Sequence, residues 1–445
     1  MRTASRPMTE GSIPRHLLRY VIPAILGDLF QVTYNTVDSV IVGKYAGANA
    51  LAAVGVASPL MSIAMFFIIG MGIGASVLMS EFYGAGDSRA LRREFATTLA
   101  MSAAFSLAIA LGLFALARPL LADPERPNKL KAGRDDLVYP CLRCMACISE
   151  SFVPYVRHCS RIRRCPANPT AYKEIPASQV KKTDEPKRVL VIGGGPAGME
   201  AAAELAERGH SVVLCEREQE LGGAMRYAKY VPFKQKVDQL MQVMIRRLER
   251  SGAELRLGTE ATQELAEELQ PDVIVAALGA KAKRPDVPGG ERAIMAADAL
   301  RDIDSIGQTA AVIGGGLVGC EIALQLGMTG RSVQLISRKK EVCRDAAYLY
   351  REGLLMELGK VPVTILNEAD CVAVTGNGAV IRTPDGSELE MKADSVIWAG
   401  GYLPMDDEAE QFRTLAYDFW KIGDCAQVRK IFNARREGYN AGSNI

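Results

Sequence analysis

Cysteines are concentrated in one short stretch of this 445-residue chain, which holds five of its ten. Cys141, Cys144 and Cys147 form a C-x-x-C-x-x-C run, and Cys159 and Cys165 follow it. Three thiolates at this spacing let one tight loop wrap a cubic 4Fe-4S cluster, which a distant thiolate followed by proline completes. Cys165 precedes a proline and Cys159 a serine, so Cys165 is the favoured fourth ligand and Cys159 the alternative. A structural zinc is the competing interpretation, although zinc sites usually use two separated cysteine pairs.

A dinucleotide-binding fingerprint follows the cysteines in KRVLVIGGGPAGMEAAAELAERGHSVVLCERE, residues 187–218. An apolar strand leads into Gly193, Gly195 and Gly198, a helix and a second strand that ends at Glu216. The first glycine allows a tight turn, the second lets the backbone approach a pyrophosphate, and the third lets the helix pack on the strand. The pyrophosphate is expected at the helix amino end. Glu216 is placed to accept a hydrogen bond from a ribose hydroxyl.

The same pattern recurs in TAAVIGGGLVGCEIALQLGMTGRSVQLISRKK, residues 309–340. Its glycines are Gly314, Gly316 and Gly319, and Ser337 takes the place that Glu216 has in the first fingerprint. A carboxylate would repel a 2′-phosphate, whereas Ser337 followed by Arg338 and Lys339 could bind one. The second site therefore favours NADPH. NADH stays open, because basic residues after a strand are also common on solvated surfaces.

Two fingerprints in one chain predict an α/β protein, in which an FAD domain contains an inserted NAD(P)H domain. The apolar runs 273–280 and 395–401 each end in a glycine turn and suit the two crossings between these domains. Gly423 and Asp424, in WKIGDCAQ, form a strand-end pair of the kind that contacts the FAD ribityl-phosphate region. The expected boundaries are residues 186–305 and 396–445 for the FAD domain, and 306–395 for the NAD(P)H domain.

The amino-terminal part has a different composition. The chain is 49% hydrophobic with a mean hydropathy of +0.06, but the apolar residues gather in three segments, at about 17–42, 51–79 and 96–121. Each is long enough for a transmembrane helix. The first contains polar residues, including Asp28 and Asp38, which would either line an ion or substrate route or face partner helices.

Residues 11–121 resemble the amino-terminal helices of a multidrug and toxin extrusion (MATE) transporter. The resemblance rests on PAILGDLFQVTYNTVDSVIVGKYAGANALAAVG and GMGIGASVLMSEFYGAGD. It implies that residues 1–121 form membrane helices in contact with lipid, with Asp38 on a helix associated with cation coupling. Such transporters have two bundles of six helices. With three helices here, transport is not expected, and a truncated efflux transporter is the alternative function.

Residues 122–445 resemble the carboxy-terminal half of iron-sulfur flavoenzymes related to 2,4-dienoyl-CoA reductase, trimethylamine dehydrogenase and the bile-acid enoate reductases. DPERPNKLKAGRDD, CLRCMAC and RCPANP carry the likeness, with E-x-x-x-x-L-G-G at Glu216–Gly223 as the flavin-side turn. It implies a linker and cluster segment at 122–185, hydride transfer from NADPH to FAD, and single electrons through the cluster. The family's FMN-bearing TIM barrel is not among these residues, so FMN and enoyl reduction are not expected, the catalytic residues are unknown, and the electron acceptor is unidentified.

The two resemblances meet in LFALARPLLADPERPNK, residues 113–129, whose first half suits a membrane helix and whose second half suits the flavoenzyme. We therefore expect a chimera, made by recombination or mistaken assembly. Three membrane crossings would place the reductase outside the cytoplasm, away from the reduced nicotinamide and reducing conditions that it needs. With two crossings, the reductase would lie in the cytoplasm. The net charge of +2 and the absence of a basic stripe make nucleic acid an unsuitable partner.

Overall fold

The computed structural model describes residues 14, 21–22, 25, 29, 33, 69–70, 72–148, 164–171 and 182–445. The chain divides into two compact units, Met1–Leu113 and Phe114–Ile445. Most of the first and second expected membrane segments lies outside the described residues, and so does Cys159.

The third expected segment is helical. Helix α3 (Ser88–Ala122) begins after Asp87, whose carboxylate accepts the N–H groups of Arg89 and Ala90 at 3.0 and 2.9 Å. This is a typical amino-terminal cap. Among the helices within the described residues, none combines the length and the apolar character that a membrane crossing requires.

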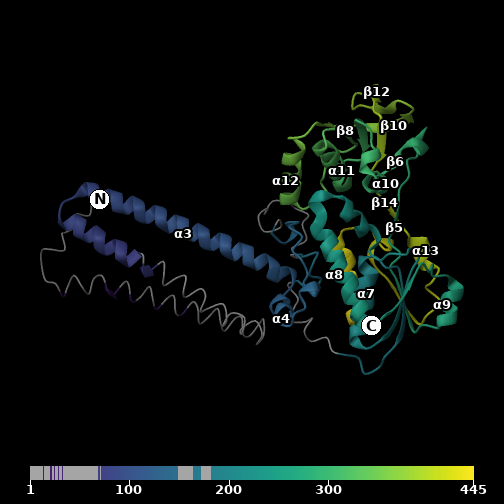
Figure 1. Cartoon of the computed structure of the whole chain (residues 1–445), viewed down its shortest axis with the longest axis horizontal. Helices are drawn as coiled ribbons and strands as arrows, with labels where there is room; N and C mark the ends of the chain where they lie inside the picture. The colour runs from purple at the N-terminus through teal and green to yellow at the C-terminus, as the bar shows by residue number, and fades with distance from the viewer. Residues whose placement is uncertain are drawn as a thin grey trace. The chain divides into compact units, whose positions relative to one another are not determined.

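A five-stranded parallel sheet forms the centre of the first dinucleotide fold, with the strand order β15-β4-β1-β2-β3. Figure 1 shows two helices of this fold, α7 (Pro196–Arg208) and α8 (Gln235–Ser251), side by side. β4 is apolar and buried along its whole length, and β1 is so from Val189 onward, as expected for strands covered on both faces. The strand β15 comes from the carboxy-terminal part of the chain, after the second fold, so the first fold is built from two separate stretches of sequence. The strands are β1 (Arg188–Ile192), β2 (Ser211–Glu216), β3 (Glu254–Leu257), β4 (Val273–Ala276) and β15 (Asp418–Lys421).

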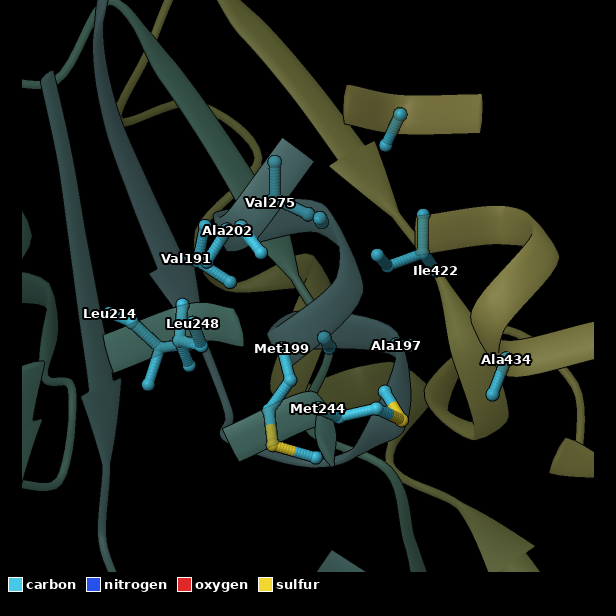
Figure 2. Close-up of a cluster of buried hydrophobic side chains, with 14 of the residues drawn as sticks. Val191, Ala197, Met199, Ala202, Leu214, Met244, Leu248, Val275, Ile422 and Ala434 are labelled. Carbon is cyan, nitrogen blue, oxygen red and sulfur yellow. The ribbon is translucent and has the colours of Figure 1, made fainter. Parts of the chain in front are cut away.

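Helices cover this sheet, and α7 (Pro196–Arg208) packs against both α8 (Gln235–Ser251) and α14 (Ile431–Asn444). Small side chains on α7 and glycines on α14 let these two helices pack closely against each other. Figure 2 shows labelled core side chains from the strands (Val191, Leu214, Val275), from α7 and α8 (Ala197, Met199, Ala202, Met244, Leu248) and from the carboxy-terminal segment (Ile422, Ala434).

A second five-stranded parallel sheet has the order β6-β13-β7-β8-β9, with a three-stranded antiparallel sheet, β10-β11-β12, as a separate layer. The strands are β6 (Ile294–Met295), β7 (Thr309–Ile313), β8 (Ser332–Ser337), β9 (Val363–Asn367), β10 (Asp370–Thr375), β11 (Gly378–Arg382), β12 (Glu388–Lys392) and β13 (Ser395–Trp398). The helices of this part are α10 (Ala296–Arg301), α11 (Leu317–Met328) and α12 (Tyr348–Leu358).

Two short strands, β5 (Ala280–Ala282) and β14 (Tyr402–Pro404), pair antiparallel where the chain passes between the two folds. They follow the two apolar runs expected to make these crossings. The remaining helices are α4 (Arg126–Lys131), α9 (Gln263–Leu269) and α13 (Asp406–Glu410), and the 3-10 turns are η1 (Asp135–Leu137), η2 (Gly223–Tyr230), η3 (Pro232–Lys234), η4 (Gly290–Arg292), η5 (Ile303–Ser305) and η6 (Gly423–Cys425).

The repeat seen in the sequence is also a repeat of strand register. Arg188 pairs with Ser211 between β1 and β2, and Thr309 pairs with Ser332 between β7 and β8, at the same offset along the chain. The predicted α/β class with two dinucleotide-binding folds is confirmed. The exact domain boundaries stay predictions.

Candidate functional site

The three fingerprint glycines of the first fold differ in their surroundings as their expected roles require. At Gly193, with φ +106°, an added Cβ would lie 2.4 Å from the carbonyl oxygen of Ala277, and at Gly198 it would lie 1.9 Å from that of Gly193. At Gly195 it would meet no atom within 4 Å. A side chain at Gly193 or Gly198 would therefore clash with the neighbouring backbone, whereas the space beside Gly195 is open to a ligand.

Helix α7 begins directly after Gly195 and has no side-chain capping hydrogen bond. An uncapped helix start offers N–H groups and a partial positive charge to an anion. Glu216 lies beside this turn, where its Oε2 accepts the N–H of Gly194 at 2.6 Å and its Oε1 accepts the N–H of Glu218 at 2.9 Å. The carboxylate is thereby fixed next to the predicted pyrophosphate position, which suits a contact with ribose.

Two more glycines predicted to contact FAD, Gly223 and Gly423, lie beside this turn and the start of α7. An added Cβ at Gly223 would lie 3.1 Å from the Cα of Gly195, and one at Gly423 would lie 2.9 Å from the Cβ of Ala197. Asp424 follows, and its Oδ1 accepts the N–H of Arg429 at 3.0 Å. Burial raises the pKa of Asp424 above its ordinary value.

The second turn repeats these relationships. An added Cβ at Gly314 would lie 2.3 Å from the carbonyl oxygen of Ala399, and one at Gly319 would lie 1.9 Å from that of Gly314. At Gly316 the nearest atom is Oδ1 of Asp345, at 3.9 Å. The second turn is therefore shaped for a ligand at the same position, but a carboxylate lies near it.

The residues expected to choose between NADPH and NADH lie at the end of β8. Ser337 is buried against the turn, 2.5 Å from the position of an added Cβ at Gly315, and its Oγ accepts the N–H of Lys339 at 3.2 Å. The side chain of Arg338 is 71% exposed and has one distant partner, Asp370, at 3.9 Å. This arrangement leaves the guanidinium available to a phosphate, and the NADPH preference stays a prediction.

All four predicted cluster ligands line one pocket: Cys141, Cys144, Cys147 and Cys165. Arg143 and Arg164 line it too, and among the described residues that line it there is no carboxylate or histidine. A donor set of four thiols beside cationic side chains fits an anionic iron-sulfur cluster.

The thiols lie close enough together to shift one another's pKa values. Burial raises the pKa of the Cys165 thiol to about 12, with further upward contributions from Cys144 and Cys147. Burial also raises the pKa of Cys144, and the N–H of Ala146 lowers it in part. Within the described residues, no three His, Cys, Asp or Glu side chains are arranged to hold a metal ion. The 4Fe-4S cluster therefore stays a prediction.

The loop that carries the first three cysteines has an unusual backbone. Arg143 and Met145, on either side of Cys144, have φ values of +55° and +59°. Non-glycine residues in the left-handed region are uncommon and gather at ligand-binding sites. Neither residue is glycine or asparagine, so this backbone conformation could not be predicted from the residue types.

A buried ion pair connects the cysteine pocket to the first fold. Arg435 on α14 donates to Oε2 of Glu200 on α7, with Nη2 at 2.6 Å, and also to the carbonyl oxygens of Pro166 and Ala167. Arg247 on α8 donates to Oε1 of Glu200 at 2.8 Å. None of these three residues was predicted from the motifs, although a carboxylate within the apolar face of a fingerprint helix, as at Glu200, is an available signal.

The junction segment enters the reductase fold at its last few helical residues. Leu121 lines the cysteine pocket, and its carbonyl oxygen accepts the Asn168 amide at 3.0 Å. Ala122 is buried in the same core as α7. Asp123 accepts the N–H of Tyr139 at 2.9 Å and pairs with Lys129 at 2.8 Å. From Leu121 onward the chain is thus integrated with the flavoenzyme-like part.

Comparisons with known proteins agree with this division. A family model described as "Pyridine nucleotide-disulphide oxidoreductase" matches residues 187–438, and one described as "MatE" matches residues 23–123. The chain is 32% identical to an NADH oxidase of Thermoanaerobacter brockii in an alignment of 342 residues that covers 74% of this chain and 51% of that protein. It is also 32% identical to a cinnamate reductase of Clostridium sporogenes over 336 residues, 75% of this chain and 50% of that protein.

Among solved structures, a 2-naphthoyl-CoA reductase complex superposes with a TM-score of 0.68 at 29% identity, covering 74% of this chain and 50% of that one. The chain spans about half the length of the curated relatives it matches.

Proposed function

The chain belongs to the pyridine nucleotide-disulphide oxidoreductase family and is an NAD(P)H-dependent oxidoreductase, and we propose that it is an electron-transfer module that uses FAD and a 4Fe-4S cluster. The observation that carries the proposal is the pair of glycine turns, each with open space at its second glycine. These turns support two dinucleotide sites, of which the one with Glu216 suits FAD and the one with Ser337 suits NADPH.

The residues of this chain would bind and orient the cofactors. Gly195 and the start of α7 would hold the FAD pyrophosphate, and Gly423 and Asp424 would lie on its ribityl side. When bound, FAD takes a hydride from NAD(P)H and the cluster takes up electrons one at a time. Cys141, Cys144, Cys147 and Cys165 would hold the cluster, and their pocket is joined to α7 through Arg435 and Glu200.

The electron acceptor is unidentified, so the proposal is tested with an artificial one. The purified 445-residue chain should reduce ferricyanide or a redox dye with NADPH, and it should fail to turn over an enoyl-CoA. Absence of NADPH- and NADH-dependent dye reduction from a flavin-loaded preparation would contradict the proposal. Turnover of an enoyl-CoA would refute the narrower claim that substrate reduction needs a further domain.

The MatE match supports a second, separate proposal about origin. We infer that the chain joins a transporter-like segment to a reductase within residues 118–128, where Leu121 and Ala122 already belong to the reductase core. In source cells, an intact mass or a peptide spanning Arg118–Asn128 would support a real fused polypeptide. Separate masses for the two parts would show that the fusion is an artefact.

A further inference from the structure

The start of α11, where the second fingerprint would hold a nucleotide pyrophosphate, already has an anionic partner. The backbone N–H of Leu317, the first residue of the helix, donates to Oδ1 of Asp345 at 2.9 Å. The other carboxylate oxygen, Oδ2, lies 2.6 Å from Nζ of Lys430. Asp345 belongs to the NAD(P)H-type fold and Lys430 to the returning FAD-type fold, so this ion pair joins the two.

The first fold gives an internal comparison. The equivalent helix position there is Pro196, which has no N–H to donate, and both helices have a glycine N-cap that makes no side-chain capping bond. A carboxylate therefore cannot bind at Pro196 as Asp345 does at Leu317. The carboxylate beside the first turn, that of Glu216, accepts the N–H of Gly194 instead. The difference singles out Asp345 as a feature of the nicotinamide site.

Asp345 is charged at neutral pH. Burial raises its pKa, but the Lys430 ammonium and the Leu317 N–H outweigh this, and the net pKa lies below the ordinary value of an aspartate. A carboxylate at a helix start uses the same N–H groups and partial positive charge that favour a phosphate. The two anions cannot occupy that position together.

We propose that Asp345 is a competitor built into the nicotinamide site: its carboxylate occupies the pyrophosphate position at the start of α11, and the nucleotide must displace it from Leu317 and Lys430. This inference rests on the proposed function and deepens it. The side chains of Lys430 and Asp345 are 48% and 45% exposed. Half-exposed ion pairs are weak, so a nucleotide can break this one, and Asp345 lowers affinity without abolishing binding.

The test measures equilibrium dissociation constants of NADP⁺ and NAD⁺, which bind without reducing the flavin, on the flavin-loaded full chain. Asp345→Asn and Asp345→Ser remove the charge. Both should bind both nucleotides about three- to tenfold more tightly, since a charge at a helix end has an effect of this size. The gain should be equal for the two nucleotides, because the pyrophosphate is common to them. Damage to the fold would weaken binding, so a gain cannot arise from misfolding.

Glu357→Gln is the matched control. Glu357 lies in the same fold and pairs with Lys360 at 2.6 Å, but it caps no helix start in the described structure. This variant should bind both nucleotides within about twofold of the wild type, as expected for a surface charge. An equal gain in Glu357→Gln would overturn the proposal in favour of a general charge effect.

Unchanged or weaker binding by both Asp345 variants, with flavin retained, would overturn the proposal and leave the proposed function standing. If neither the wild type nor any variant binds either nucleotide, the proposed function fails, and the inference fails with it.

Discussion

Arg435 and Glu200 form an ion pair that is almost completely withdrawn from solvent: their side chains are 0% and 2% exposed, and Nη2 lies 2.6 Å from Oε2. Glu200 is two residues after the last fingerprint glycine, and Arg435 also holds the carbonyl oxygens that follow Cys165. One side-chain pair thus connects the predicted FAD helix to the predicted cluster loop.

Removing Arg435 should destabilise the chain strongly, because a buried carboxylate would lose one of its two arginine partners. We expect Arg435→Met to lower the free energy of unfolding by about 3 kcal/mol, measured by urea denaturation. The control is Arg382→Met, which breaks an ion pair with Glu388 whose side chains are 55% and 50% exposed. That change should stay within about 0.5 kcal/mol. Similar losses in both variants would show that the buried pair has no special role.

The second glycine of each turn should be needed for a ligand and not for folding. Gly195→Ala should fold and lose bound flavin, while Gly316→Ala should keep its flavin and bind NADPH more weakly. An added Cβ meets no atom within 4 Å at the first position and only a distant carboxylate at the second. Flavin content and NADPH titration measure both effects.

Gly353→Ala is the matched control for these two variants. Gly353 lies within α12, where an added Cβ also meets nothing within 4 Å. It should change neither ligand, and alanine should favour the helix slightly. Full flavin occupancy in Gly195→Ala would contradict the assignment of FAD to the first turn.

Much of the site could be predicted from sequence because its signals are local. The glycine spacing, the apolar strands before it and the cysteine run each lie within a few residues, and the structure brings Cys165 to the pocket of the other three cysteines. The Asp345 and Arg435 contacts could not be predicted in this way. Leu317 and Asp345 are 28 residues apart, and Glu200 and Arg435 are 235 apart, so their meeting depends on the packing of whole folds.

The choice of nicotinamide nucleotide should depend on the basic residues after β8. We expect the double substitution Arg338→Ala and Lys339→Ala to lower kcat/KM for NADPH about 10- to 100-fold, the size expected for losing charge-assisted hydrogen bonds to a phosphate. The value for NADH should change by less than about threefold, since NADH has no 2′-phosphate. Steady-state dye reduction with each nucleotide measures both. Equal losses for the two nucleotides would contradict a 2′-phosphate site at Arg338.

Stability should fall in mild acid because of His210. This side chain is buried, and its Nδ1 accepts the N–H of Lys187 at 3.2 Å. Burial lowers its pKa, and Arg208 and Lys187 lower it further. Below the unfolded-state pKa of about 6.5, the unfolded chain binds more protons than the folded one. The stability contributed by neutral His210 is therefore present above that pH and is lost as the pH falls.

His210→Gln should make the free energy of unfolding less dependent on pH between pH 7.5 and pH 5.5, since its amide oxygen can accept the same N–H without titrating. Urea denaturation at the two pH values measures this. A wild-type slope in the variant would exclude His210 as the source.

The most direct test of the central claim is an anaerobic titration of the purified chain with NADPH, followed by visible absorbance and by EPR. We predict that the flavin absorbance bleaches and that the EPR signal of a reduced 4Fe-4S cluster appears. Cys165→Ser should keep the flavin response and lose the EPR signal, and Cys159→Ser should keep both. A preparation that contains neither bound flavin nor a reducible cluster would contradict the account.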